Sequence, residues 1–154
     1  MPKSEESSTT YTIRPATLAD VQHVIRLDTQ ITAVPKPEYW RGLFERYGAE
    51  GDDRFFLVAM QGNQLLGFII GEVRAWEFGS PPCGWIFAVN VDPEIRLGGV
   101  GSALFDAMCD CFRKAKVSRV RTMLARDAQL LMSFFRSQGM MAGPFIELEK
   151  DLDE

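Results

Sequence analysis

Apolar side chains recur along this chain with two different spacings, and stretches of the two kinds alternate. Alternation at every second residue, or a short run that is apolar throughout, predicts a β-strand, whereas spacing of three and four predicts an amphipathic helix. Strands are predicted over residues 11–14, 54–60, 64–74, 85–91, 117–124 and 145–149. Helices are predicted over residues 18–27, 38–47, 100–116 and 129–136. This order predicts a mixed α/β fold with a largely antiparallel sheet and one strand–helix–strand unit.

Capping and turn residues support several of these boundaries. Residues 17–20 resemble a capping box at the start of the first helix, with Asp20 in place of the usual Glu. Gln61-Gly62-Asn63 is a turn that joins the second and third strands into a hairpin. Residues 85–91 are almost all apolar, which predicts a strand in the centre of the sheet. Gly139 is well placed to end the last helix.

Length and composition limit the class of protein. The chain has 154 residues, of which 46% are hydrophobic and 25% charged, as in an ordinary globular protein. This composition excludes a disordered chain, a fibre and a coiled coil. No apolar run approaches the about 20 residues that cross a membrane, so no membrane partner is expected. Residues 1–10 predict a disordered polar tail rather than a signal peptide, and residues 11–154 a single domain.

Cysteine and histidine usage indicates neither a disulfide framework nor a metal site. The three cysteines are odd in number and lack framework spacing, which predicts reduced thiols in a cytoplasmic protein. With one His and no Cys-x-x-Cys pair, no metal is expected. A Gly-x-Ser-x-Gly nucleophile signature is also missing from the sequence.

Charge is unevenly distributed along the chain. The formal net charge is −4, yet residues 96–136 hold eight Lys and Arg against three Asp. A local basic field in an acidic protein favours a small polyanionic ligand over a nucleic acid. A set of solvated helix faces explains the same pattern and stays open as an alternative.

Residues 89–104 carry the most specific chemical signal. An apolar strand runs into a glycine-rich turn, and the turn opens an amphipathic helix. Backbone N–H groups of such a turn and of the first helical turn bind phosphate, and Arg96 adds a full charge at the mouth of the site. A dinucleotide fingerprint is excluded by Leu104 at the third glycine position, and a triphosphate loop by its missing Lys. The pattern that remains is Arg96-x-x-Gly99-x-Gly101.

This pattern, preceded by a strand that ends in Val-Asp-Pro, resembles the acyl-CoA loop of the GNAT superfamily of N-acetyltransferases. Residues 13–27, 134–140 and 145–152 are similar to that family's first strand and helix, last helix and closing strand. The resemblance implies a single GNAT-like α/β (α+β) domain. It has a mixed, mostly antiparallel sheet of about 6–7 strands and about four helices, with strands four and five splayed into a wedge for CoA.

The resemblance also implies the reaction and its binding residues. An N-acetyltransferase of this kind moves an acetyl group from acetyl-CoA to a primary amine by direct attack in a ternary complex. The pantetheine arm pairs with Val89 and Val91, and the N–H of Val91 stabilises the oxyanion. The pyrophosphate is held beside Arg96 by backbone N–H groups of Leu97, Gly98, Gly99, Val100, Gly101 and Ser102.

Two positions depart from the family's pattern. Phe135 stands where many members carry a Tyr that protonates the leaving thiolate, and Ala128 stands where they carry an Asn. Phe135 packs on the cofactor arm but donates no proton. The alternative function is therefore an acyl-CoA-binding regulatory module with little turnover. Candidate bases for the amine are Glu72 and Glu77 at the end of the third strand, and Glu72 is the catalytic prediction.

The acceptor is predicted by charge alone. An acidic surface outside residues 96–136 favours a cationic amine, either a small molecule or a peptide. The family often dimerises and the final strand is able to pair across subunits, so a homodimer is compatible with the sequence. A third interpretation, a nucleotide or phosphate binder on another α/β fold, would be supported by ATP or NAD competing with CoA.

Overall fold

The computed structural model describes residues 10–48, 51–95 and 98–153, and the chain divides into two compact units, Met1–Met123 and Leu124–Glu154. The predicted tail falls outside the described residues except for Thr10. In its described part the first unit has five strands: β1 (Thr12–Pro15), β2 (Arg54–Gln61), β3 (Gln64–Arg74), β4 (Cys83–Val91) and β5 (Val120–Thr122). Its α-helices are α1 (Val21–Thr32), α2 (Pro37–Tyr47) and α3 (Val100–Lys114), while the second unit holds α4 (Gln129–Ser137).

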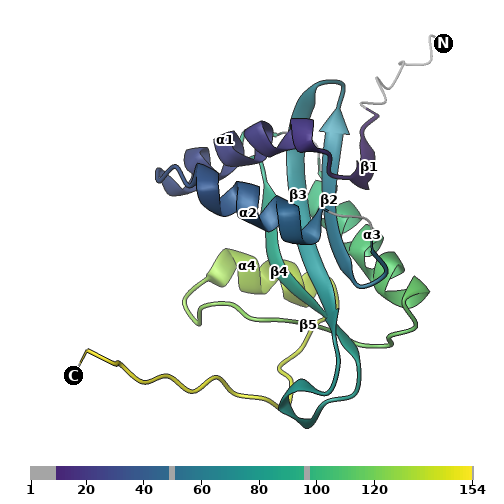
Figure 1. Cartoon of the computed structure of the whole chain (residues 1–154), viewed down its shortest axis with the longest axis vertical. Helices are drawn as coiled ribbons and strands as arrows, with labels where there is room; N and C mark the ends of the chain where they lie inside the picture. Colours follow the sequence, from purple (N-terminus) through teal and green to yellow (C-terminus); the bar gives the residue numbers. More distant parts are fainter. Residues whose placement is uncertain (1–9, 49–50, 96–97, 154) are drawn as a thin grey trace, which may run out of the picture. The chain divides into compact units, whose positions relative to one another are not determined.

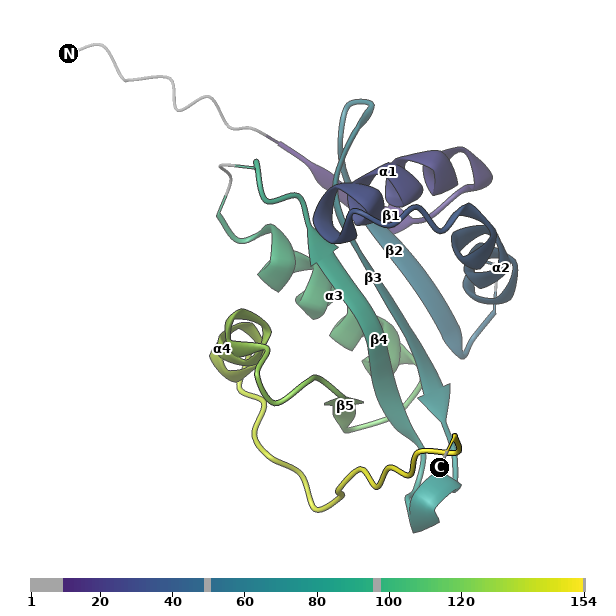
Figure 2. The same ribbon diagram turned by 90° about the vertical axis from the view of Figure 1, so that its left-hand side faces the viewer.

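The strands form one sheet in chain order, β1-β2-β3-β4-β5. The first four are antiparallel to their neighbours, and β5 lies parallel to β4. A parallel neighbour requires a crossover connection, which α3 provides between β4 and β5. Figures 1 and 2 show α1 and α2 covering one face of the sheet and α3 covering the other.

The core under α1 and α2 is built on an aromatic contact. The rings of Trp40 and Phe68 meet edge to face with centroids 5.2 Å apart. Trp40 also donates its Nε1–H to Oδ2 of the buried Asp28 at 3.0 Å, and Lys36 lies 3.2 Å from the same oxygen. This carboxylate is therefore paired, as burial of a charge requires. The same core contains, with Trp40 and Phe68, the buried apolar residues Ala16, Val21, Val24, Leu27, Leu43, Phe56, Val58, Met60, Leu65 and Ile70.

Helix α3 packs against the other face of the sheet, where glycines in β3 and β4 leave room for its side chains. Leu104, Met108 and Phe112 are buried along one side of the helix at spacings of four. A Cβ atom on Gly84 would stand only 2.4 Å from the Phe112 ring, so a larger residue cannot occupy this position without a shift. Burial of each large apolar side chain contributes about 1.5–3 kcal/mol. The packing holds α3 against β3 and β4.

The predicted capping box is present at the start of the 3₁₀ turn Leu18–Asp20 that precedes α1. The Thr17 N–H donates to Asp20 Oδ2 at 2.7 Å, and Arg14 lies 2.6 Å from the same carboxylate. Burial opposes ionisation of Asp20, but the hydrogen bonds from Arg14 and Thr17 outweigh it and hold the pKa of the carboxyl below its usual value. The same pair raises the pKa of Arg14.

The prediction of a closing strand over residues 145–149 is wrong: the described residues after α4 form no strand. Ile146 and Leu148 are 82% and 86% exposed, so the alternating pattern there finds no apolar surface to cover. A strand needs a hydrogen-bonded neighbour, and alternation alone does not supply one. The described part of the sheet consequently has five strands rather than 6–7.

The strand predicted over residues 117–124 is also shorter than expected. Only Val120–Thr122 pairs with β4. Before it, Lys116 takes a φ of 63° and the Val117 N–H donates to Phe112 O at 3.2 Å, so the chain is still leaving α3 at that point. The helix-exit turn therefore overrides the strand pattern at 117–119.

Candidate functional site

Strand β4 is paired with β5 over only part of its length. The register joins Gly84, Trp85 and Ile86 to β5, and Thr122 Oγ1 donates to Ile86 O at 2.9 Å at the last pair. Beyond this point no described strand lies on that side of residues 87–91. Figure 2 shows β5 beside the lower part of β4 only. The predicted splay of strands four and five is thus present.

A β-bulge lies at the point where β4 leaves β5. Ile70 pairs with Ala88 and Gly71 pairs with Ile86, so Phe87 is an extra residue in β4. Bulges bend a strand and increase its local twist. Phe87 therefore marks the branch point between the paired and the open part of β4.

In the open part of β4, the backbone groups of Val89 and Val91 point away from β3. Asp92 donates its N–H to Leu66 O at 2.8 Å, which makes residues 66 and 92 a hydrogen-bonded pair. In an antiparallel ladder such pairs alternate with pairs whose backbone groups point outward. Val89 and Val91 consequently point their N–H and C=O groups toward the open edge. This is the edge at which the family resemblance implies that the pantetheine arm pairs.

The glycine loop ends at the N-terminus of α3 with open space before it. Gly99 is the N-cap at a φ of 85°, a left-handed conformation that favours glycine, and its carbonyl accepts the Ala103 N–H at 2.9 Å. A Cβ on Gly98 or Gly99 would meet nothing within 4 Å. Buried Val100 anchors the first turn, which continues through Gly101 and Ser102. Arg96 and Leu97 lie outside the described residues.

This arrangement suits a phosphate group. The first N–H groups of an α-helix lack intrahelical acceptors, and the helix dipole adds partial positive charge at the same end. The space in front of Gly98 and Gly99 lets an anion approach the backbone. The chemistry of the donors thus fits the pyrophosphate of acetyl-CoA.

Glu72 is the centre of an ion-pair network near the end of β3. Its side chain is 15% exposed, and its carboxylate lies 2.9 Å from Arg74 Nε and 3.6 Å from Arg54 Nε. Arg74 also reaches Glu77 at 3.5 Å. The two glutamates singled out in the sequence are therefore joined through one arginine, and Glu72 is the more buried of them.

Two aromatic rings connect this network to the branch point. The Arg74 guanidinium lies 4.6 Å from the centroid of the Phe87 ring, and Tyr47 meets Phe87 with centroids 6.0 Å apart. Burial and the nearby Glu72 raise the pKa of Tyr47. The site residues predicted from the sequence did not include Arg54, Arg74 or Phe87. No local motif marks them, because the register between strands brings them together.

Phe135 lies in α4, in the second unit. It is 4% exposed, and its ring meets Phe134 with centroids 5.2 Å apart. After α4, Gly139 has a φ of 90° and donates its N–H to Arg136 O at 2.9 Å, which confirms the predicted helix end. An apolar ring at this position supplies no acidic proton.

Neither the cysteines nor the histidine forms a metal cluster in the described residues. Cys109 and Cys111 lie on α3, and burial raises the pKa of both thiols. His23 lies on α1, outside the ion-pair network of Glu72. Among the described residues no helix is long and apolar enough to cross a bilayer.

Comparisons with known proteins agree with this geometry. A sequence profile of the acetyltransferase (GNAT) family matches residues 20–140, whereas no curated protein sequence matches the chain. The solved aminoglycoside N-acetyltransferase AAC(6')-Iy in complex with CoA is similar at a TM-score of 0.81 and 15% identity, with 99% of each chain covered. A transcriptional regulator from Bacillus halodurans C-125 has a TM-score of 0.79 at 15% identity, covering 93% of this chain and 100% of that one. AAC(6')-IG from Acinetobacter haemolyticus has a TM-score of 0.76 at 18% identity, covering 92% and 99%.

Because the family profile spans well over half of the sequence, this chain belongs to the acetyltransferase (GNAT) family. The solved structures, all at low identity, show the same fold. The predicted family resemblance and fold class are confirmed. The predicted acyltransferase class, with acetyl-CoA as co-substrate, is confirmed by the family membership.

Proposed function

We propose that this protein transfers the acetyl group of acetyl-CoA to a primary amine by direct attack in a ternary complex. The observation that carries this proposal is the open part of β4, which is followed along the chain by the glycine loop and the N-terminus of α3. The pantetheine arm extends along Val89 and Val91 as an added strand. The pyrophosphate accepts hydrogen bonds from the backbone at residues 97–102, with Arg96 beside it.

The chemistry needs one oxyanion donor and one base. The amine nitrogen attacks the thioester carbonyl carbon, and the negative charge that forms on the carbonyl oxygen is stabilised by the Val91 N–H. Breaking of the C–S bond releases CoA as a thiolate. Glu72 is the candidate that takes the proton from the amine, and Arg74 holds its carboxylate in place. Because Glu72 lies opposite Trp85, six residues along β4 from Val91, the proton reaches the carboxylate through intervening water rather than by direct contact. Water protonates the thiolate because Phe135 has no hydroxyl.

The acceptor in this proposal is a cationic amine, carried by a small molecule or a peptide. The net charge of −4, despite the basic stretch at 96–136, leaves the rest of the chain acidic and attractive to cations. One structural neighbour from a soil metagenome was solved with sisomicin, an observation about that protein that supports an amine acceptor here. The family match runs through both units, which supports one catalytic domain over residues 11–154.

Calorimetric titration with acetyl-CoA tests the co-substrate site. Gly98→Ala places a methyl group in the open space before α3 without a structural clash, so the fold stays intact while acetyl-CoA binds several-fold more weakly. Gly42→Ala is the matched control, because its new methyl group also meets nothing within 4 Å but lies on α2. Equal affinity in both variants would place the glycine loop outside the acetyl-CoA site.

A pH profile tests the role of Glu72. Glu72→Gln removes the proton acceptor, so kcat falls by about 10²-fold or more and the acidic limb of the profile changes. Glu77→Gln is the control, because it also removes a carboxylate bound to Arg74 but lies in the 3₁₀ turn Glu77–Gly79, where its side chain is 53% exposed. If Glu72→Gln changes only KM and leaves the pH profile of kcat intact, Glu72 is not the base.

Phe135 supports a second candidate function, an acyl-CoA-binding regulatory module with little turnover. An acid that protonates the thiolate is missing at this position, whereas the proposed binding of acetyl-CoA does not require one. In that case acetyl-CoA binds, and free CoA is released slowly with every amine in an acceptor screen. Phe135→Tyr then increases the rate of CoA release. Appreciable steady-state turnover of the unaltered protein excludes this candidate.

A further inference from the structure

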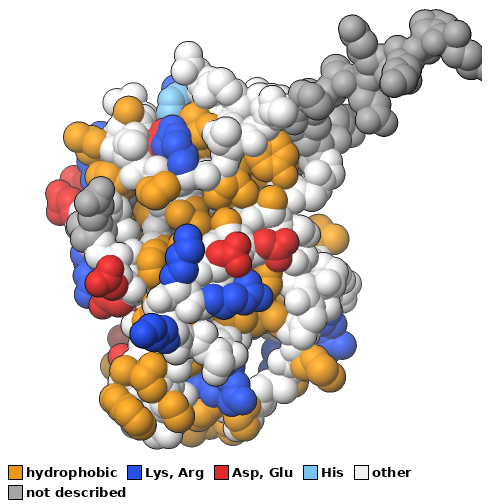
Figure 3. All heavy atoms as spheres, turned by 90° about the vertical axis from the view of Figure 1, so that its right-hand side faces the viewer, with side chains coloured by type: hydrophobic (Ala, Val, Ile, Leu, Met, Phe, Trp, Pro, Cys, Tyr) orange, Lys and Arg blue, Asp and Glu red, His pale blue; other side chains and the backbone are white. Residues whose placement is uncertain are grey.

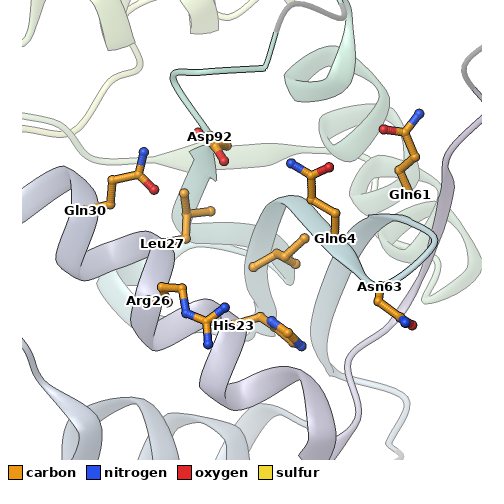
Figure 4. Close-up of a pocket in the computed structure, with 9 residues that line it drawn as sticks. His23, Arg26, Leu27, Gln30, Gln61, Asn63, Gln64 and Asp92 are labelled. Carbon is orange, nitrogen blue, oxygen red and sulfur yellow. The ribbon is translucent and has the colours of Figure 1, made fainter.

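The first unit has a hollow of about 490 Å³ beside α1, and none of its lining residues is among those assigned above to acetyl transfer. Figure 4 shows it between α1, the turn that joins β2 to β3, and the residue that follows β4. Its lining consists of seven polar residues and two leucines: His23, Arg26, Leu27, Gln30, Gln61, Asn63, Gln64, Leu65 and Asp92.

The helical side of the hollow is one continuous face of α1. His23, Arg26, Leu27 and Gln30 follow the spacing that places residues on the same side of a helix. Leu27 is only 4% exposed and forms the apolar base of the hollow between the polar side chains. Figure 4 shows Gln30, Asp92 and Gln64 around this leucine. The hollow thus combines a small apolar base with hydrogen-bonding groups above it.

Most of the polar side chains in this hollow have no partner among the described residues. Arg14, Arg54 and Arg74 all form ion pairs elsewhere in the first unit, whereas the Arg26 guanidinium forms none with a described residue. No side-chain hydrogen bond to a described residue is formed by His23, Gln30, Gln61, Asn63 or Gln64. Six sets of unused donors and acceptors therefore line one hollow.

Asp92 is held in place by its backbone. Its N–H donates to Leu66 O at 2.8 Å, and its Oδ1 accepts the Glu94 N–H at 2.9 Å. A carboxylate has room for further hydrogen bonds after accepting one. Asp92 thereby adds a fixed acceptor to the hollow, of opposite charge to Arg26.

The chemistry of the lining selects among ligand classes. Four amide side chains supply donors and acceptors in equal number, and Arg26 and Asp92 balance each other in charge. An anion would face the carboxylate, and an apolar molecule would leave the amides without partners. Hydroxyl groups both donate and accept, so they satisfy such a lining. We propose that this hollow binds a small polyhydroxylated molecule of the sugar or cyclitol class, at a site separate from that of acetyl-CoA.

An NMR titration of the full-length ¹⁵N-labelled protein tests the proposal, with trehalose, glucose and myo-inositol as probes. These probes carry no amine, so any binding is independent of acetyl transfer. At least one of them shifts amide signals of α1 and of residues 61–64 in a saturable way. Arg26→Ala and Gln64→Ala each remove exposed hydrogen-bonding groups that would contact the probe, and weaken that binding about threefold to tenfold.

Gln22→Ala is the matched control. Gln22 is exposed on the same helix and does not line the hollow, so its replacement leaves the affinity unchanged. Lack of a saturable shift with all three probes overturns the proposal. So does an equal loss of affinity in Gln22→Ala. Displacement of the bound probe by acetyl-CoA also overturns it, since the hollow would then be part of the co-substrate site.

Discussion

Adding a single methyl group at Gly67 tests whether the position of β4 governs acetyl-CoA binding. Gly67 lies opposite Val91 in the antiparallel register. A Cβ atom there would stand 2.6 Å from Asn90 O and 3.2 Å from Val91 Cα. These are backbone atoms, which have no rotamer that avoids the contact. Gly67→Ala therefore pushes the open part of β4 away from β3.

The size of the effect follows from these distances. Ordinary contacts begin at 3.4 Å, so the Asn90 carbonyl must retreat by about 0.8 Å. Overpacking of this kind costs about 1–3 kcal/mol of folding free energy. For a chain of this length that lowers Tm by roughly 3–10 °C. Misaligned backbone groups at Val89 and Val91 weaken acetyl-CoA binding about threefold to tenfold, the value of one hydrogen bond.

The assay combines thermal unfolding with calorimetric titration of acetyl-CoA. Gly84→Ala is the control for destabilisation, because its Cβ meets the Phe112 side chain at 2.4 Å in the part of β4 that stays paired with β5. Both variants lose stability, and only Gly67→Ala loses acetyl-CoA affinity. A Tm for Gly67→Ala equal to that of the unaltered protein would contradict this prediction, as would an equal loss of affinity in both variants.

Three further predictions concern the stability and reactivity of the first unit. The pKa of Asp20 is lower in the folded than in the unfolded protein, so its pair with Arg14 stabilises the fold above the unfolded pKa of the carboxyl. This contribution disappears as pH falls below about 4. In urea unfolding, the free energy of unfolding therefore falls less on acidification in Asp20→Asn than in the unaltered protein. Trp40→Phe leaves the buried Asp28 without its indole donor and costs about 1–3 kcal/mol in the same assay, more than Tyr39→Phe at an exposed position. The raised pKa of Cys109 makes its alkylation by iodoacetamide slow at pH 7 and faster above pH 9, measured by mass spectrometry; equal rates at both pH values contradict this.

Local signals were sufficient for most of the elements and for the glycine loop. The capping box at 17–20, the turn at 61–63 and the helix end at Gly139 each depend on residues a few positions apart. The same is true of the loop between β4 and α3, where Gly99 takes the left-handed conformation that only a glycine adopts at low cost. The splay of β4 from β5 was predicted through the family resemblance, since no local spacing encodes it.

The sequence by itself therefore determined most of the periodic elements, the glycine loop and the family. The tertiary structure alone decided the bulge at Phe87, the outward direction of Val89 and Val91, and the arginines that hold Glu72. It also decided that residues 145–149 do not form a strand in the described chain. The physical reason is the range of the interactions. Helix periodicity and turn conformation are set by neighbours within a few residues, whereas strand register and ion pairs depend on partners brought together by the fold.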